Sequence, residues 1–224
     1  MPLYEKRQEN GISLESDTQD FVVHLGRAFQ QQPRAGCVIP SSGLFRFVSN
    51  KGDRRRSDHS NVRRVRLDGW KSPYPAGAKG HIAFKFKLAK SCFATGDTPG
   101  AWINLFELHA RKLPTDKEDP TGPLRLILER SDEGKFYYRV RLRSFDGAVT
   151  ILKQVEAVQG REEHFTIDFR NDQSGWVFVS HNGQPFADHE GSFSYGTRAL
   201  YACFGLYSSE REGEMRAVFD IEAL

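Results

Sequence analysis

Long hydrophobic runs are missing from this 224-residue sequence, and its first residues contain no apolar segment of the kind that a signal peptide requires. A helix that crosses a bilayer needs about 20 consecutive apolar residues. We therefore expect a soluble protein that does not associate with a membrane. The expected compartment is the cytoplasm, or the exterior or periplasm if a signal peptide has been removed.

Cysteine is scarce, because the chain has only Cys37, Cys92 and Cys203. They form no CxxC pair, and no histidine lies at zinc-ligand spacing from them. The sequence thus indicates neither a disulfide framework nor a zinc site, and at most one disulfide could form. We expect no required cofactor, and nothing in the sequence indicates the structural calcium ion that a loop could hold.

Amphipathic helical periodicity longer than two or three turns is also absent, as are repeats and low-complexity segments. A hydrophobic content of 38%, with 17 Phe, 7 Tyr and 3 Trp, is nevertheless enough for a packed core. The length suits one large all-β domain. We expect residues 1–20 to be a polar tail or lead-in and residues 21–224 to be this single domain.

Period-two alternation predicts the strands. The clearest is residues 80–88, in which every second side chain from Ile82 to Leu88 is apolar. Further strands are predicted at residues 21–25, 43–48, 61–67, 102–109, 124–129, 136–143, 148–153, 164–170, 176–180, 201–207 and 215–221. Asn182-Gly183 predicts a tight hairpin turn. Short strands at these intervals are typical of an antiparallel β-sandwich.

The segment from Tyr201 to Tyr207 has two contrasting faces. Tyr201, Cys203, Gly205 and Tyr207 lie on one side of the predicted strand, and Ala202, Phe204 and Leu206 lie on the other. A glycine in the middle of the polar side would let a ligand approach the backbone closely. The same residues also fit an ordinary sandwich strand whose tyrosines find partners at the rim.

Positive charge is concentrated in one segment, although the net charge is only +3. Residues 51–66 hold seven Lys or Arg against two Asp, which favours a polyanionic partner. Within this segment Arg64 and Arg66 share one face of a predicted strand, so two guanidinium groups project together.

Two other predicted strands carry polar faces. Glu107 and His109 share one face of residues 102–109. The polar face of residues 136–143 fits either a groove lining or an outer surface, and it consists of Tyr137, Arg139, Arg141 and Arg143.

Four patches, in this order, resemble the heparin lyase I-like polysaccharide lyases and, more distantly, the alginate and glucuronan lyases. The patches are Leu44-Phe45-Arg46-Phe47 with Gly52-Asp53, Arg64-Val65-Arg66-Leu67, Leu105-Phe106-Glu107-Leu108-His109, and Gly175-Trp176-Val177-Phe178-Val179 with Asn182-Gly183 and the strand from Tyr201 to Tyr207. The resemblance implies an all-β antiparallel β-sandwich, a jelly roll of the concanavalin-like lectin/glucanase type.

The resemblance also implies a lyase that cleaves a uronate-containing acidic polysaccharide by β-elimination. Tyr207 and His109 would be its acid/base pair, and Arg64 would neutralise the substrate carboxylate. The implied substrate-binding residues are Arg66, Glu107, Tyr201, Cys203 and Arg56.

Three positions depart from the family pattern. Cys203 stands where the family usually has Lys, Arg66 where it has Glu, and Glu107 where it often has Gln. Arg66 could replace the missing cation on the same face. Glu107 could orient the imidazole of His109 or pair with a nearby arginine, and Cys203 fits a small groove-facing residue better than a nucleophile.

Other function classes lead to different expectations. A non-catalytic lectin-like domain for acidic glycans would result if the change at Cys203 removes catalysis. Nucleic-acid binding through residues 51–66 would need aromatics among the arginines, and that segment has none. A glycoside hydrolase would need paired inward carboxylates, which no predicted strand carries. We expect a monomer whose partner is an acidic polysaccharide rather than a nucleic acid.

Overall fold

The computed structural model describes residues 21–24, 27–32, 37–41, 44–49, 62–69, 72–93, 99–114, 122–143, 148–191, 197–209 and 213–224. The predicted tail at residues 1–20 and the predicted substrate-binding residue Arg56 lie outside these ranges. Both therefore stay predictions.

Within this part of the chain, two antiparallel sheets are present. The eight-stranded sheet has the order β1 (Phe21–His24), β2 (Arg27–Gln32), β5 (Val62–Asp68), β14 (Leu200–Ser209), β7 (Trp102–Ala110), β8 (Leu124–Arg130), β9 (Phe136–Arg143), β10 (Val149–Glu156). The seven-stranded sheet has the order β13 (Gln184–Glu190), β12 (Trp176–His181), β11 (Glu162–Arg170), β6 (Lys79–Leu88), β15 (Met215–Ala223), β4 (Leu44–Ser49), β3 (Cys37–Ser41).

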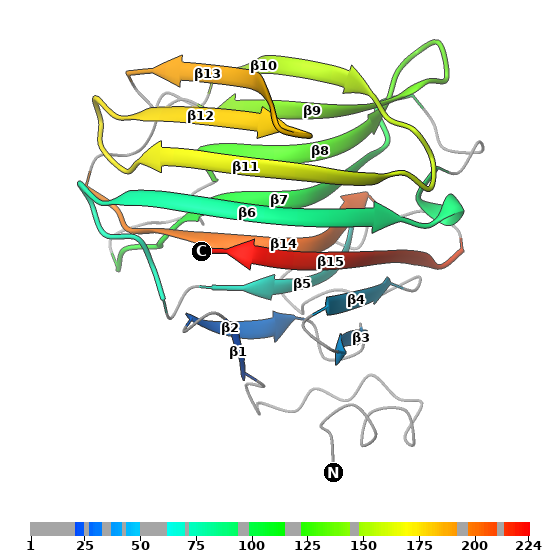
Figure 1. Ribbon diagram of the computed structural model, residues 1–224, viewed down its shortest axis with the longest axis horizontal. Helices are drawn as coiled ribbons and strands as arrows, with labels where there is room; N and C mark the ends of the chain where they lie inside the picture. Colours follow the sequence, from blue (N-terminus) through cyan, green and yellow to red (C-terminus); the bar gives the residue numbers. More distant parts are fainter. Residues whose placement is uncertain are drawn as a thin grey trace.

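The two sheets pack face to face, as Figure 1 shows, and aromatic rings fill the space between them. The ring centroid of Phe84 on β6 lies 5.2 Å from that of Phe106 on β7 and 5.3 Å from that of Phe204 on β14. Burial of each such side chain contributes roughly 1.5–3 kcal/mol. This cluster therefore fixes the positions of β7 and β14, the strands that carry most of the predicted site.

The predicted all-β antiparallel sandwich is confirmed, and each predicted strand overlaps an observed one. Sequence reasoning missed β2, β3 and β13. β3 and β13 are the edges of the seven-stranded sheet and contain Pro40 and Pro185. Proline is tolerated at edges because it cannot donate to a ladder. The absence of long helices also holds in the described ranges, where the only helix is the 3₁₀ turn Lys90–Phe93, too short to cross a membrane.

The predicted hairpin at Asn182-Gly183 is confirmed. His181 pairs with Gln184 across it, and both turn residues have positive φ, 51° for Asn182 and 75° for Gly183. Two consecutive residues with positive φ define a type I′ turn, whose twist matches that of the flanking strands.

Bulges interrupt β7 and β14 at the same level of the sheet. Leu105 has no partner in β8, since Asn104 pairs with Ile127 and Phe106 with Leu126. Both Leu105 and Phe106 are buried in the core. A bulge changes which side chains share a face, so Asn104 lies on the outer face of the sheet together with Glu107.

Gly205 belongs to the bulge in β14, and its φ is 142°. A Cβ at this position would lie 2.3 Å from the carbonyl oxygen of Val65 and 2.7 Å from Cα of Arg66. The glycine therefore permits the close approach of the β5 backbone. The sequence interpretation, which connected this glycine to an approaching ligand, is corrected by this contact.

Candidate active site

The predicted site residues within the described ranges lie on the outer face of the eight-stranded sheet. They come from β5, β14 and β7, which are adjacent strands (Figure 1). The core side of these strands is occupied by Val65, Leu67, Phe204, Leu206 and Leu108. We call the outer face of these three strands the site face; it carries Arg64, Arg66, Asn104, Glu107, His109, Tyr201, Cys203 and Tyr207.

Arg64 and Tyr207 are in direct contact. They are partners in the register of β5 and β14, and the guanidinium carbon of Arg64 lies 4.6 Å from the ring centroid of Tyr207. Arg64 is 7% exposed, whereas Tyr207 is half-buried. A cation–π contact of this kind fixes both side chains, so the arginine is held in place beside an accessible phenol.

Two side chains from β7 border Tyr207 on its other side. Trp102 packs edge-on against it, with 5.2 Å between ring centroids, and Asn104 is its cross-strand partner. Nδ2 of Asn104 donates to Glu107 at 3.3 Å, while its buried Oδ1 has no hydrogen-bond partner among the described residues. A buried acceptor in this state costs roughly 1–3 kcal/mol. A donor on a ligand would remove that cost.

Sequence reasoning missed Asn104. Strict alternation along β7 places Asn104 and Glu107 on opposite faces, and the bulge at Leu105 reverses that assignment. No residue type in the segment marks a bulge of this kind, so the sequence contained no usable signal for it.

Glu107 is the centre of a buried ion network. Its Oε1 accepts from Nε of Arg125 at 2.9 Å and from the backbone N–H of Gly122 at 3.1 Å. Its Oε2 accepts from Arg66 at 3.1 Å and from Asn104 at 3.3 Å. Since Glu107 is 1% exposed, all of its acceptor capacity is used inside the protein.

The charge of Glu107 is fixed. Burial raises its pKa, but the electrostatic effects of Arg125, His109 and Arg66, together with the hydrogen bond from Arg125, outweigh burial and lower the pKa to about 2. Glu107 is therefore an ionised structural partner of two arginines at neutral pH. It does not orient the imidazole of His109, because Nδ1 of His109 donates to the carbonyl of Ala110 at 2.8 Å.

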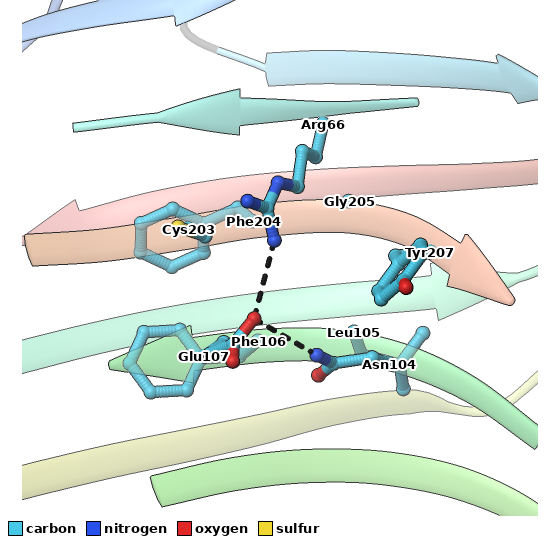
Figure 2. A pocket seen from close by; sticks show the side chains of 9 residues that line it. All are labelled: Arg66, Asn104, Leu105, Phe106, Glu107, Cys203, Phe204, Gly205 and Tyr207. Carbon is cyan, nitrogen blue, oxygen red and sulfur yellow. Dashed lines mark hydrogen bonds and ion pairs between the residues drawn. The ribbon is translucent and has the colours of Figure 1, made fainter. Parts of the chain in front are cut away.

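Arg66 reaches across β14 to Glu107, as Figure 2 shows. Its Nε lies 2.6 Å from Oδ1 of Asp68, and its Nη1 lies 3.1 Å from Oε2 of Glu107. Arg66 and Cys203 line the same pocket (Figure 2). The prediction that Arg66 replaces a substrate-binding cation is corrected, because two carboxylates already neutralise this charge.

Cys203 is a lining residue. It is 2% exposed, and burial raises the pKa of its thiol well above the ordinary value, with a further increase caused by Asp68. A neutral buried thiol is a poor nucleophile. With Arg66, Asn104, Gly205 and Tyr207 it lines a small pocket (Figure 2). The volume of this pocket is about 10 Å³, which is room for roughly one water molecule or one hydroxyl group.

His109 lies at the other end of the site face from Tyr207. Its partner is Tyr201, and the two rings stack with centroids 5.1 Å apart. Tyr207 is instead the partner of Asn104, and at about 3.3 Å per residue these two levels are roughly 13–20 Å apart. Proton transfer needs contacts of about 2.6–3.2 Å. The acid/base pair of Tyr207 and His109 is therefore not formed, because one sugar could not contact both.

The arginines of β9 continue the site face. Arg141 is the cross-strand partner of Arg125, which bonds to Glu107. Arg141 and Arg139 also form ion pairs with Glu129. Of the two interpretations that the sequence left open, this position favours a lining of the same face. Within the described ranges, no three His, Cys, Asp or Glu side chains form a group that could hold a metal ion.

No protein-family model matches the sequence, and no curated protein matches it either. Solved structures do match the fold. A β-1,4-glucuronan lyase from the fungus Trichoderma reesei superposes with a TM-score of 0.61 at 11% identity, over 87% of this chain and 88% of that one. An alginate lyase from Pseudomonas aeruginosa gives 0.59 at 17% identity, over 82% and 84%.

A third structure, an alginate lyase from Zobellia galactanivorans, gives a TM-score of 0.55 at 10% identity, over 96% of this chain and 85% of that one. Identities this low establish the fold alone. They support the coarser part of the predicted resemblance and do not single out the heparin lyase I-like group. The chain has the jelly-roll β-sandwich fold of these alginate and glucuronan lyases.

Proposed function

We propose that this protein is a polysaccharide lyase that cleaves a uronate-containing acidic polysaccharide by β-elimination. The observation that carries the proposal is the contact between Arg64 and Tyr207, which places a cation 4.6 Å from an accessible phenol ring. The fold adds support, because glucuronan and alginate lyases share it. A lyase needs both groups, one to neutralise a carboxylate and one to move a proton.

The difficult step is removal of the weakly acidic proton at C5, next to the carboxylate of the uronate. Arg64 would bind the carboxylate and stabilise the charge that develops there. Tyr207, as the phenolate, would take the C5 proton. The electron pair of that C–H bond forms the C4=C5 double bond, the C4–O bond breaks, and the leaving oxygen recovers the proton from Tyr207.

Asn104 would position the sugar for this step. Its buried Oδ1 has no protein partner in the described part of the chain and lies in the pocket next to Tyr207. A sugar hydroxyl that donates to this oxygen would be held at a fixed place relative to the phenol. Alignment of this kind is a major source of rate enhancement.

A polyuronate such as alginate or glucuronan fits the site better than a highly sulfated glycosaminoglycan. Arg66 and Arg125 are paired with Asp68 and Glu107, and Arg139 and Arg141 of β9 are paired with Glu129. Sulfate groups would need cations that are not already neutralised. Cleavage of heparin, but not of alginate or glucuronan, would contradict this preference and would favour the heparin lyase I-like part of the resemblance.

The test is incubation with alginate, glucuronan, heparin and other glycosaminoglycans, followed by the ultraviolet absorbance of the unsaturated uronyl end. We expect absorbance to rise with alginate or glucuronan and not with the Tyr207→Phe variant. If no polymer of this panel gives the signal, the protein is not a lyase of this class.

A lectin-like domain for acidic glycans is the second candidate. The observation that favours it is the separation of His109 from Tyr207, together with the neutralised charge of Arg66. Such a domain would bind uronate oligosaccharides without turnover, and Tyr207→Phe would leave its affinity nearly unchanged. Calorimetry with alginate and glucuronan oligosaccharides measures this directly.

A further inference from the structure

Two aromatic side chains of β12 lie on the outer face of the seven-stranded sheet, on the opposite side of the sandwich from the site face. Val177 and Val179 are buried in the core, so Trp176 and Phe178 point the other way. Phe178 is 40% exposed and Trp176 is half-buried. We call Trp176 and Phe178 the aromatic pair. Two rings at consecutive outward positions of one strand offer a joined surface on which a ligand can stack.

Carboxylates border both rings. Phe178 is the cross-strand partner of Asp168 on β11 and of Asp188 on β13, and Trp176 is the partner of Glu190 on β13. These three strands are neighbours in the sheet, as Figure 1 shows. Cross-strand partners have Cβ atoms about 4.5–5.5 Å apart. Each ring of the aromatic pair therefore has at least one carboxylate beside it.

The basic side chains at this end of the face do not cancel these carboxylates. Nη2 of Arg170 lies 3.3 Å from Oδ2 of Asp172, and Nδ1 of His81 lies 2.7 Å from Oδ1 of Asp168. Lys79 is on β6, two strands away from the rings. The immediate surroundings of the aromatic pair are therefore acidic, and this charge repels a polyuronate. The surface is not an extension of the site face.

This combination of groups suits a cationic ligand. An ammonium or guanidinium group is attracted to the face of an aromatic ring, most strongly to that of Trp, and a guanidinium also stacks on it. A carboxylate next to the ring accepts hydrogen bonds from the same cation. Asp188 and Glu190 are both exposed and so are accessible to such a ligand.

The spacing of the two rings favours a peptide as the ligand. Trp176 and Phe178 are two residues apart on one strand, which is roughly 6.4–6.8 Å. Alternate residues of an extended peptide have the same spacing and point to the same side. A peptide that lies along β12 with Arg or Lys at alternate positions would therefore place one cation over each ring.

We propose that the aromatic pair and its three carboxylates, Asp168, Asp188 and Glu190, form a docking surface for an extended basic segment of another protein, with Arg or Lys at alternate positions. The inference does not depend on the proposed lyase function, because the surface belongs to the other sheet. A partner that docks there leaves the site face open to substrate.

The test is a proton–nitrogen NMR titration with a short synthetic peptide in which Arg and Ser alternate. The indole signal of Trp176 is identified by its absence in Trp176→Phe. We expect the peptide to shift this signal and not that of Trp102, which packs against Tyr207. Phe178→Ala and Asp188→Asn should each weaken binding about two- to fivefold. High salt should weaken it further, because the carboxylates are exposed.

Two controls separate specific docking from general attraction between charges. Glu162→Gln is the matched variant, because Glu162 is an exposed carboxylate of β11 on the same face, roughly 20 Å from Asp168 along the strand. It should bind the peptide as the wild type does. A second peptide with the same number of arginines at every third position, where they alternate between its two sides, should bind more weakly.

Each outcome supports or overturns the proposal. A peptide that leaves the Trp176 signal in place overturns it, and so does equal affinity in the wild type and Phe178→Ala. A shift caused by a chitosan or cellulose oligosaccharide, without one caused by the peptide, would identify a glycan-binding surface and overturn it as well. The dispersion of the NMR signals establishes that each variant is folded. If Phe178→Ala does not fold, Phe178→Leu, which keeps the apolar volume but not the ring, replaces it.

Discussion

Arg64 and Tyr207 are cross-strand partners, so one backbone register fixes the distance between the cation and the phenol of the candidate site. Neither side chain needs a loop to bring it into position. Sites built on strands hold their geometry better than sites built on loops. Substitution of either residue of this pair is therefore expected to change the reaction rate strongly.

Tyr207→Phe should lower kcat about 10²- to 10⁴-fold, because the phenol hydroxyl is the proposed proton-transfer group. Substrate affinity should change little, since the ring and its contact with Arg64 remain. Initial rates of ultraviolet absorbance with alginate or glucuronan measure the first effect, and calorimetry measures the second. His81→Ala, on the seven-stranded sheet, is the control and should keep its activity; a Tyr207→Phe variant as active as wild type contradicts the assignment.

Arg64→Gln should lower kcat/KM about 10²- to 10³-fold, the usual effect when a group that stabilises a developing charge is removed. Arg64→Lys should fall between Gln and wild type, because the charge remains while bidentate binding of the carboxylate is lost. The measurement is kcat/KM for the three proteins, which should decrease in the order wild type, Arg64→Lys, Arg64→Gln. Identical rates for Lys and Gln would mean that the charge of Arg64 does not act on the substrate.

Glu107 should make stability depend on pH. Its pKa is lowered from 4.5 to about 2 in the folded protein, so its contribution is present above about pH 4.5 and is lost as the pH falls towards 2. A shift of this size corresponds to about 3 kcal/mol. Urea unfolding at several pH values between 7 and 2 should show this loss in the wild type and a smaller one in Glu107→Gln.

The Glu107→Gln variant should also be less stable at pH 7, because Arg66 and Arg125 lose the charge they share. Glu190→Gln, at an exposed position on β13, is the control and should match the wild type at both ends of the pH range. Parallel pH profiles for wild type and Glu107→Gln would show that Glu107 does not carry this dependence.

Gly205→Ala should destabilise the protein by roughly 2–6 kcal/mol, since the added Cβ meets backbone atoms of β5 and the residue has positive φ. Gly77→Ala separates the two causes. Gly77 also has positive φ, 81°, but no atom lies within 4 Å of an added Cβ. We expect roughly 1–2 kcal/mol there, and equal losses in a denaturant titration would mean that the close approach of β5 costs nothing.

Alternation was sufficient to predict the strands and much of the site face. Arg64 and Arg66 share a face as predicted, and Ala202, Phe204 and Leu206 lie in the core. Period two determines these assignments wherever a strand is regular. β2 and β13 were missed because their polar pattern differs little from that of a loop, and β3 was missed because its five residues are too few to show a period.

The partners of the site residues could not be predicted in the same way. Asn104 reaches the site face only through a bulge, and His109 meets Tyr201 because of the register between β7 and β14. Likewise, the ion pairs of Glu107 join residues 41 and 18 positions apart in the chain. Strand register and bulges depend on packing between distant segments, which the order of residues in one strand does not specify.

The buried network around Glu107 has a consequence for behaviour at different ionic strengths. Its two guanidinium groups and two carboxylates cancel, so the part of the site around Glu107 presents almost no net field to an approaching polyanion. Dissolved salt weakens attraction between unbalanced exposed charges far more than it weakens a buried balanced set. Around Glu107, recognition of an acidic polysaccharide would depend on shape and hydrogen bonding. Binding there would persist at salt concentrations that disrupt binding by exposed charges alone.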